Sequence, residues 1–466
     1  MIRHMLLPLA LLLSFVAPRA TLAQHAVALV GGTLLDGTGA APIADAVVVA
    51  RDGRIACAGP ARACAVTGDV AVVDVSGRWI VPGLVDAHVH YSQTGWVDGR
   101  PDALDLRERF PYEETIAELE TPEPFYRSYL CSGVTATFDV GGYPWTWGLR
   151  EPAGHSTSAP HVAAAGPLLS TRDHWLNQPA ERQFLWIDSD SAVTRGVSYL
   201  AANETDAVKV WFLVSATSPD TASWVGLLQQ AGVEAERMGL PLIVHATTLW
   251  GAKQAVRAGA DLLVHGVFDR PVDDEFLALA RAAGTIYTPT IVVGDGYRQI
   301  RARDFEAERY GDALDCVDPE TLHKAFLTDS LPGGATEAER ARMRAASEDA
   351  FRIQAENVRR VHEAGIPIAV GTDAGNPLTL HGPALYLEME ALQRAGLEPV
   401  EVLAAATRTA ARAMGMLAEI GTIERGKVAD LLVLARDPTA DTSNLRSVLL
   451  IMRNGRVWTR DELEYR

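Results

Sequence analysis

The stretch Val81-Pro82-Gly83-Leu84-Val85-Asp86-Ala87-His88-Val89-His90 is the one around which the chain is organised. An apolar run stops at a Pro-Gly pair, resumes as a short strand and ends in two histidines spaced i and i+2. Residues two apart on a β-strand point to the same face, so His88 and His90 present two imidazoles side by side. Imidazole suits Zn²⁺ and similar ions, although two histidines at this spacing also occur by chance on exposed strands. The other ligands of a metal site would have to come from the rest of the chain.

Length and composition indicate a globular protein large enough to be an enzyme. The chain has 466 residues, of which 48% are hydrophobic and 22% charged, an ordinary balance for a protein with a large core. Its formal net charge is −17. Because phosphate binding needs clustered lysine and arginine, this charge argues against nucleic acid as a partner.

The first residues have the pattern of a secretory signal peptide. The pair Arg3-His4 precedes an apolar run at 5–16, and Thr21 and Ala23 stand at the −3 and −1 positions of a cleavage site. We therefore expect residues 1–23 to be removed and the chain to be exported, to the bacterial periplasm or beyond the cell. The apolar run is too short to span a bilayer as a mature helix, so no membrane attachment is expected after cleavage.

The four cysteines leave their pairing open. Cys57 and Cys64 flank a Gly-Pro turn and could form a disulfide across a hairpin, which export would permit. Their spacing matches no zinc ribbon. For Cys131 and Cys316, buried free thiols are an equally good interpretation.

Two groups of short β-strands lie at opposite ends of the chain. Residues 24–80 contain apolar runs such as Val27-Ala28-Leu29-Val30 between glycine-rich turns. Residues 424–466 repeat this style, with Asn454-Gly455 as a hairpin turn. We predict that the two groups combine into one small β-sandwich domain.

Between these groups, short apolar strands alternate with helical stretches, which is typical of a parallel α/β architecture. Eight such strands predict a (β/α)₈ (TIM) barrel over residues 81–423, in which catalytic residues follow the carboxyl ends of the strands. The predicted strands are Leu84–His88, Val134–Asp139, His161–Ala165, Ala207–Phe212, Leu242–Ala246, Leu262–His265, Ile286–Thr290 and Ile368–Thr372.

Polar side chains interrupt or end five of these otherwise apolar strands. Besides His88, Lys209 lies inside Val208-Lys209-Val210-Trp211, His245 and His265 end two later strands, and Asp373 follows the last. Burying a polar group without a partner costs several kcal/mol, so packing alone explains five such residues poorly. Single residues have simpler alternatives: Lys209 could reach solvent along its stem, and Asp373 could cap the next helix.

A polar, helical segment at about 295–350 separates the seventh and eighth predicted strands. It is rich in arginine and acidic residues and breaks at Leu331-Pro332-Gly333-Gly334. It could be a solvated decoration. Because long loops after barrel strands often cover active sites, we interpret it as a lid.

Together these motifs resemble the amidohydrolase superfamily, and within it the imidazolonepropionase-like and Xaa-Pro dipeptidase-like branch. The resemblance covers nearly the whole mature chain. Besides the opening stretch, it rests on Gly31–Gly39, Asp52-Gly53-Arg54-Ile55, Val244-His245-Ala246, Val264-His265-Gly266, Gly371-Thr372-Asp373-Ala374-Gly375 and Gly421–Leu431.

The resemblance implies a centre of two divalent metal ions, most often zinc. Its ligands would be His88, His90 and Asp373 for the first ion and His245 and His265 for the second, with Lys209, carboxylated by CO₂, as a bridge. A free ammonium cannot ligate a metal, whereas a carbamate offers two oxygens. Apolar surroundings would lower the pKa of this lysine and expose the neutral amine that CO₂ needs.

The implied reaction is hydrolysis of an amide, cyclic amide, N-acyl or dipeptide bond in a small molecule. Two cations would convert a shared water into hydroxide, and Asp373 would act as general base and then as general acid. The same ligands would also suit an ester, a lactone or a phosphotriester. A periplasmic binding protein without catalysis is a third interpretation, although such a protein would not need the complete ligand set.

Further side chains near the predicted strand ends are candidates for contact with substrate, and each could equally be packing: Tyr91, His174, Trp211, Thr247, Tyr287 and His381. Many relatives of the dipeptidase branch carry a tyrosine shortly after the histidine of the fifth strand. The sequence from His245 to Trp250 contains none, which argues against true Xaa-Pro dipeptidase activity. The chain could also form a homo-oligomer.

Overall fold

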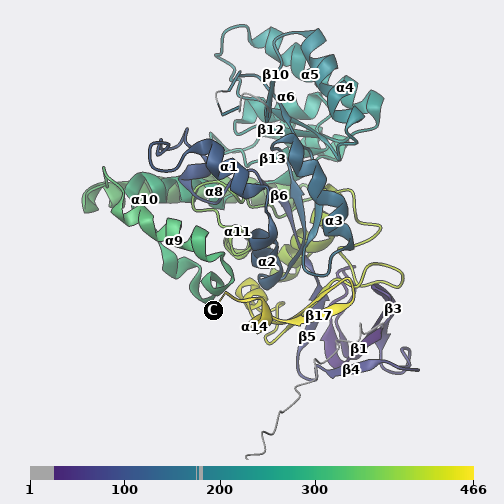
Figure 1. The fold of residues 1–466 in the computed structure, drawn as a ribbon. Coiled ribbons are helices and arrows are strands. Elements are labelled where there is room, and N and C mark those ends of the chain that lie inside the picture. The colour runs from purple at the N-terminus through teal and green to yellow at the C-terminus, as the bar shows by residue number, and fades with distance from the viewer. Residues whose placement is uncertain (1–25, 175, 178–181, 466) are drawn as a thin grey trace, which may run out of the picture.

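The structure, a computed structural model, describes residues 26–174, 176–177 and 182–465. The predicted signal peptide, residues 1–23, lies outside these described residues. None of the described helices is both long enough and apolar enough to cross a membrane. Strands from near both ends of the described chain lie side by side in a small β-rich part, below a larger part of strands and helices (Figure 1).

The small part is one sheet built from both chain ends. Its strand order is β17-β16-β15-β5-β1-β2-β3, with β4 paired to β1. The join between the two ends is the antiparallel pair of β5 and β15, in which Val81 lies opposite Leu432. The strands are β1 (Ala26–Leu34), β2 (Ile43–Arg51), β3 (Arg54–Pro60), β4 (Ala71–Asp74), β5 (Trp79–Pro82), β15 (Leu431–Leu434), β16 (Val448–Arg453) and β17 (Arg456–Thr459). Both ends therefore contribute as expected, while the form of a sandwich stays a prediction.

The larger part contains two sheets of parallel strands, with the orders β6-β7-β8 and β10-β9-β11-β12-β13-β14. The strands are β6 (Leu84–Val89), β7 (Val134–Asp139), β8 (His161–Ala164), β9 (Leu168–Ser170), β10 (Phe184–Trp186), β11 (Val208–Trp211), β12 (Leu242–His245), β13 (Leu262–Val264) and β14 (Ile286–Thr288). The first seven predicted strands correspond to β6, β7, β8, β11, β12, β13 and β14, whereas β9 and β10 were not predicted.

The prediction of an eighth strand at Ile368–Thr372 is wrong. This stretch is irregular apart from a bridge between Ile368 and Tyr287. Its backbone is nevertheless bonded on both sides. Ala369 N donates to Tyr287 O of β14, and Ala87 N of β6 donates to Val370 O, each at 3.0 Å. The N–H of Thr372 donates to the Asp86 carboxylate instead of to a neighbouring backbone. At Thr372 this side-chain bond takes the place of a backbone ladder bond, and the stretch forms no regular strand.

Helices surround these sheets and begin and end at recognisable residues. Helix α7, for example, begins at Asp273, whose side chain accepts from Phe276 N, and ends at Gly284 with positive φ. The helices are α1 (Tyr112–Leu119), α2 (Glu123–Cys131), α3 (Arg150–His155), α4 (Asp190–Ala202), α5 (Thr221–Met238), α6 (Leu249–Arg257), α7 (Asp274–Ala283), α8 (Val292–Ala302), α9 (Pro319–Leu327), α10 (Glu337–Glu363), α11 (Ala384–Arg394), α12 (Pro399–Ala404), α13 (Ala410–Ala413) and α14 (Arg460–Leu463).

Helices α8, α9 and α10 lie between β14 and the stretch that contains Ile368, where the insertion was predicted. Helix α10 extends beyond the end of the predicted segment, to Glu363, and starts with a capping box, in which Thr336 and Glu339 bond each other's backbone N–H groups. In Figure 1, α9 and α10 extend to one side of the molecule, away from α4 and α5.

Two disulfides join the four cysteines. Cys57 pairs with Cys64, the pairing that the sequence permitted. Cys131 at the end of α2 pairs with Cys316 in the short helix η4 (Gly311–Cys316), so the free-thiol interpretation of these two cysteines is wrong. Their separation of 185 residues gave the sequence no local turn from which the pair could be predicted.

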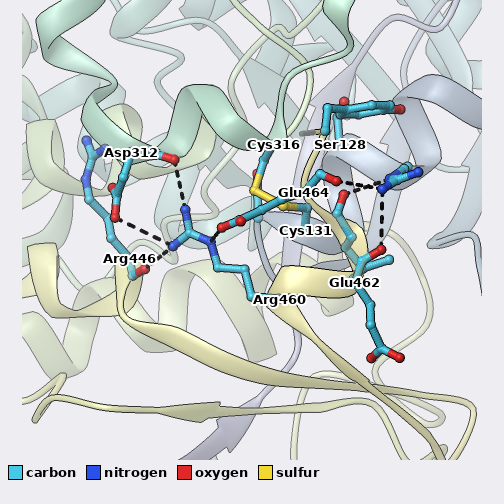
Figure 2. The surroundings of a disulfide bond; sticks show 12 residues. Ser128, Cys131, Asp312, Cys316, Arg446, Arg460, Glu462 and Glu464 are labelled. Carbon is cyan, nitrogen blue, oxygen red and sulfur yellow. Dashed lines mark hydrogen bonds and ion pairs between the residues drawn. A yellow bond between two sulfur atoms is a disulfide. The ribbon is translucent and has the colours of Figure 1, made fainter.

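The C-terminal segment also binds to α2 and to the insertion, near the disulfide between Cys131 and Cys316. Arg460 of α14 donates to the carbonyl oxygens of Arg446 and Asp312 (Figure 2). Arg127 of α2 donates to the carbonyl oxygens of Leu463 and Glu464. The insertion, α2 and the end of the chain are therefore held together at one place.

Candidate metal centre and active-site cavity

Three ligand-type atoms from two neighbouring segments converge at the carboxyl end of β6. His88 Nε2 lies 3.3 Å from His90 Nε2. Oδ1 of Asp373 lies 3.2 Å from His88 Nε2 and 2.9 Å from His90 Nε2. The i, i+2 spacing of the two histidines and the position of Asp373 beside β6 thus produce one compact triangle.

Buried backbone and carboxylate oxygens hold these ligands in place. The carboxylate of Asp86, which is fully buried in β6, accepts from the backbone N–H groups of His88 and Thr372 and from the Thr372 hydroxyl. It therefore links the two segments that carry the ligands. Nδ1 of His90 lies 2.6 Å from the carbonyl oxygen of Gly141. Because a carbonyl can only accept, Nδ1 carries the proton, which leaves Nε2 of the neutral ring as a lone pair.

His265, His245 and Lys209 extend the cluster along β13, β12 and β11. The ring centre of His265 lies 5.0 Å from that of His88 and 4.3 Å from that of His245. Its Nδ1 contacts the Thr290 hydroxyl at 2.8 Å. Lys209 is only 2% exposed and lines the same cavity as the histidines. The structure thus brings all six predicted ligand residues to one region.

This donor set fits a cation. Oδ1 of Asp373 and Nδ1 of His88 are buried atoms without a hydrogen-bond partner among the described residues. A carboxylate oxygen that faces two imidazole nitrogens, at least one of them a lone pair, is repulsive unless a proton or a metal ion lies between them. His88, His265 and Asp373 each offer a ligand atom within 4.8 Å of the others. The residues present therefore match the divalent ion that the sequence predicted.

Burial tunes the protonation of the cluster towards metal binding. It lowers the pKa of His88 to about 4 and that of His245 to about 3, so both rings are neutral at pH 7. It also lowers the pKa of Lys209 to about 7. Burial alone would raise the pKa of Asp373, but the imidazole nitrogens of His88 and His90 that face its carboxylate outweigh burial and hold that pKa well below its usual value.

A cavity of about 990 Å³ opens from this cluster. One wall consists of strand ends, including Lys209, Trp211 and Thr247, and the other consists of side chains from α8, α10 and α11. The insertion therefore forms part of the cavity wall. A volume of this size accommodates a small organic molecule with room to spare.

Asn376 connects the cavity wall to Asp373. Its Oδ1 accepts from Tyr297 of α8 at 2.8 Å and from Arg100 Nη1 at 2.5 Å, while its Nδ2 donates to the carbonyl oxygen of Asp373 at 3.1 Å. Asp373 has φ of +63°, a left-handed conformation that costs free energy in a residue with a side chain. The bonds of Asn376 help to maintain that conformation.

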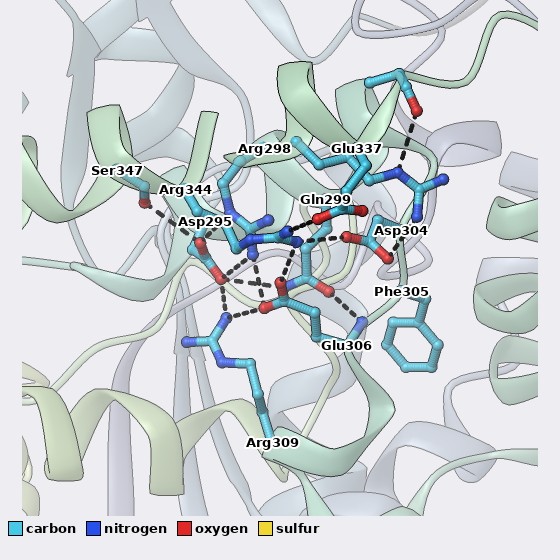
Figure 3. Close-up of polar contacts among 12 residues, drawn as sticks. Asp295, Arg298, Gln299, Asp304, Phe305, Glu306, Arg309, Glu337, Arg344 and Ser347 are labelled. Atoms are coloured by element: carbon cyan, nitrogen blue, oxygen red, sulfur yellow. Dashed lines mark hydrogen bonds and ion pairs between the residues drawn. The ribbon is translucent and has the colours of Figure 1, made fainter. Parts of the chain in front are cut away.

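Farther from the cluster, an ion-pair network holds α8 to the segment that follows it, and a hydrogen bond joins α8 to α10 (Figure 3). Arg298 contacts Asp295 at 2.6 Å and Glu306 at 2.7 Å, and Asp295 also pairs with Arg309. Ser347 of α10 donates to Asp295. These charges neutralise one another, so they serve chiefly to position the helices.

The six candidates for substrate contact fall into two groups. Trp211 and Thr247 line the cavity. The other four are not among the residues that line this cavity: the hydroxyl of Tyr91 bonds Thr137, that of Tyr287 accepts from Val267 N, His381 lies between Tyr129 and the carbonyl oxygen of Gln93, and His174 packs against Phe184 and Trp211. Substrate contact by any of the six stays a prediction.

Several residues of the site were not predicted from the sequence. The first is Asp86. It is a charged residue inside the apolar run before His88, and this position could have signalled its role. The second is Asn376, three residues after Asp373 in a turn-forming Gly-Asn-Pro sequence. Arg100 and Tyr297 lie in loop and insertion segments whose approach to Asp373 depends on tertiary packing, so no local pattern signals them.

Comparison with known proteins agrees with this geometry. The model of the family described as "Amidohydrolase family" matches residues 79–458. An imidazolonepropionase from Rhizorhabdus wittichii is 28% identical over 431 residues, covering 85% of this chain and 90% of that protein. A solved Xaa-Pro dipeptidase with bound methionine aligns with a TM-score of 0.68 at 22% identity, covering 93% of this chain and 100% of that chain. Ochratoxinase from A. niger aligns with a TM-score of 0.68 at 20% identity, covering 93% and 95% of the two chains. At these identities the likeness to the two solved structures supports the fold alone.

Proposed function

The chain belongs to the amidohydrolase family and is a hydrolase of carbon–nitrogen bonds, and on that premise we propose that it cleaves the amide bond of a small molecule at a centre of two divalent metal ions. The observation that carries the proposal is the convergence of Nε2 of His88, Nε2 of His90 and Oδ1 of Asp373, with His245, His265 and Lys209 beside them. Such a set of neutral imidazoles and carboxylate has the chemistry of a zinc site.

His88, His90 and Asp373 would hold the first ion, and His245 and His265 the second. The ions would supply Lewis acidity, which polarises the substrate carbonyl and lowers the pKa of bound water. Asp86 and the Gly141 carbonyl oxygen would keep the histidines oriented, because each fixes a ligand through a buried hydrogen bond.

Lys209 would bridge the ions as a carbamate formed with CO₂. Two features support this role: its burial at the wall of the cavity and its pKa of about 7, which leaves a large share of neutral amine at physiological pH. The carbamate would offer two oxygens where the ammonium offers none.

Asp373 would accept the proton of the attacking water at a carboxylate oxygen and return it to the departing nitrogen. Its left-handed backbone and the bond from Asn376 to its carbonyl oxygen aim the side chain into the cluster. The cavity wall would exclude bulk water from this transfer, because α8 and α10 cover it and lock together through the Asp295 network.

We further propose that the parallel strands close into a (β/α)₈ barrel. The stretch 367–374 would take the place of the eighth strand, between β14 and β6. Its backbone bonds to Tyr287 and Ala87 support this closure. Helices α8 and α10 would then be the lid over the carboxyl ends of the strands.

Export is also part of the proposal. The two disulfides support it, because such bonds persist in oxidising compartments such as the periplasm and are rare in the cytosol.

Metal loading and a substrate panel test the function. The purified protein is stripped with a chelator, reloaded with zinc and bicarbonate, and assayed on cyclic amides, dipeptides, N-acyl amino acids, lactones and phosphotriesters. We expect elemental analysis to find about two metal ions per chain. The reloaded protein should hydrolyse an amide that the stripped protein does not hydrolyse. Fewer than about one ion per chain, or turnover of esters and phosphotriesters only, would contradict the proposal.

A further inference from the structure

The charged residues that line the cavity outside the metal centre are, with one exception, paired. The pairs are Arg100 with Asp102, Arg298 with Asp295 and Glu306, Arg309 with Asp295, Arg344 with Asp304 and Glu337, Arg394 with Glu348, and Glu390 with Arg446. Each carboxylate among them therefore already faces a guanidinium. A cationic group on a substrate would have to displace one of these arginines to find a partner.

Arg301 is the exception. It lines the cavity from the last turn of α8, and no ion pair or hydrogen bond involves its side chain among the described residues. It follows Tyr297 by one helical turn, and its positive charge acts on the Tyr297 hydroxyl, which bonds Asn376 beside Asp373. An unpaired arginine thus lies on the wall of the cavity that leads to the reactive cluster.

The rest of the lid wall is largely apolar. Helix α10 contributes Met343, Ala346, Ala350 and Phe351, and α11 contributes Leu387 and Ala391. With about 990 Å³ available, the cavity can hold a hydrophobic group well beyond the size of a single amino-acid side chain. Burial of such a group against this wall favours binding in proportion to the apolar surface removed from water.

We propose that the substrate is an N-acyl amino acid with an apolar acyl group, whose carboxylate binds Arg301 and whose acyl chain lies against α10 and α11. This inference rests on the proposed function and names its substrate class. Water adds across the amide bond, so the products are the fatty or aromatic carboxylate and the free amino acid. An anion matches the one unpaired cation of the described lining, and the acylated nitrogen removes the ammonium for which that lining has no free carboxylate.

A dipeptide fits this charge pattern less well. Its ammonium would enter a cavity whose described acidic side chains are all engaged, and an unpaired charge taken out of water is costly. A neutral amide would leave Arg301 without a counter-ion and gain nothing from it.

Three matched amides test the proposal on the metal-loaded protein: N-octanoylleucine, its neutral carboxamide N-octanoylleucinamide, and the dipeptide alanylleucine. We expect kcat/KM to be highest for N-octanoylleucine. Arg301→Gln should lower that kcat/KM by about tenfold and leave the value for the carboxamide within about twofold. Arg301→Lys should restore most of the loss, because a lysine can still pair with a carboxylate. Arg281→Gln on α7, an exposed arginine outside the cavity, is the matched control and should change neither value.

A binding measurement removes any dependence on turnover. In an Asp373→Asn background, calorimetry should detect N-octanoylleucine binding that weakens by about tenfold when Arg301→Gln is added. Equal losses for the acid and the carboxamide, or a preference for alanylleucine, would overturn the substrate class while leaving amide hydrolysis intact. Absence of turnover on every amide would overturn the proposed function as well.

Discussion

The hydroxyl of Tyr297 lies 2.8 Å from Oδ1 of Asn376 and donates a hydrogen bond to it. Through this bond, helix α8 of the insertion reaches the loop that carries Asp373, because Nδ2 of Asn376 bonds the carbonyl oxygen of Asp373. Gly296 makes the approach possible: a Cβ there would lie 2.2 Å from the carbonyl oxygen of Pro377. The insertion is therefore packed directly on the reactive loop.

Tyr297→Phe should lower kcat/KM by about three- to tenfold, since it removes one hydrogen bond that positions the Asp373 loop. The melting temperature should change by only a few degrees. Tyr310→Phe is the matched control, because the Tyr310 hydroxyl bonds the carbonyl oxygen of Leu378 in the same loop but farther from Asp373. It should cost stability and leave kcat/KM nearly unchanged; a similar kinetic loss in both variants would show that the effect is one of general loop packing.

Lys209→Ala and Asp373→Asn should each reduce turnover by at least about 10³-fold while the fold is kept. Both side chains reach the cluster from buried segments whose packing does not depend on their charge. The two variants should differ in metal content, with Lys209→Ala losing more of the bound ions because it removes the bridge. Circular dichroism checks the fold and elemental analysis checks the metal. Wild-type-like rates in either variant would contradict the catalytic role of that residue.

The amine of Lys209 should react selectively near neutral pH. The chain has four lysines, of which Lys253 and Lys324 are held charged by carboxylates that raise their pKa values, and Lys427 lies 3.2 Å from Glu424. Burial instead lowers the pKa of Lys209 to about 7, so its neutral form increases as pH rises through 7 and is minor below pH 6. Metal-free protein treated with cyanate should be carbamoylated at Lys209 first at pH 7.5 and only slowly at pH 5.5, as mass spectrometry of peptides would report. Equal labelling of all four lysines would contradict this pKa.

The ligand residues could be predicted from the sequence because each ends or interrupts an apolar strand, and parallel strands bring their carboxyl ends together. His88, His245 and His265 are of this kind. Arg100, Tyr297, Asn376 and Arg301 could not, because they lie in loops and in the insertion, and their approach to the cluster is a product of tertiary packing. The stretch from Ile368 to Thr372 is the opposite case, in which a local pattern predicts an element that does not form. Its apolar pattern predicts a strand, but the N–H of Thr372 donates to the buried carboxylate of Asp86.

Removing residues from Gly426 onward should prevent folding. Strand β5 would lose its partner β15, and His161 would lose its contact at 2.9 Å with the buried carboxylate of Asp430. We expect the shortened chain to aggregate, which centrifugation and size-exclusion chromatography would detect. Coexpression of the missing fragment should return part of the chain to the soluble fraction, because the β5–β15 pairing can form between separate chains. A soluble and active shortened chain would show that the two chain ends fold independently.

The two disulfides should differ in their contribution to stability. Cys131 and Cys316 close a loop of 185 residues, whereas Cys57 and Cys64 are separated by seven. In the chain-entropy model a longer loop restricts the unfolded chain more, and the difference between these loops amounts to about 3 kcal/mol. The double variant Cys131→Ala/Cys316→Ala should therefore lower the unfolding midpoint in urea clearly more than Cys57→Ala/Cys64→Ala does. It should also make the segment between α8 and α10 more sensitive to proteolysis, since the bond joins η4 of the insertion to α2. Equal losses of stability would mean that local packing at each pair, and not the length of the closed loop, determines what the bonds contribute.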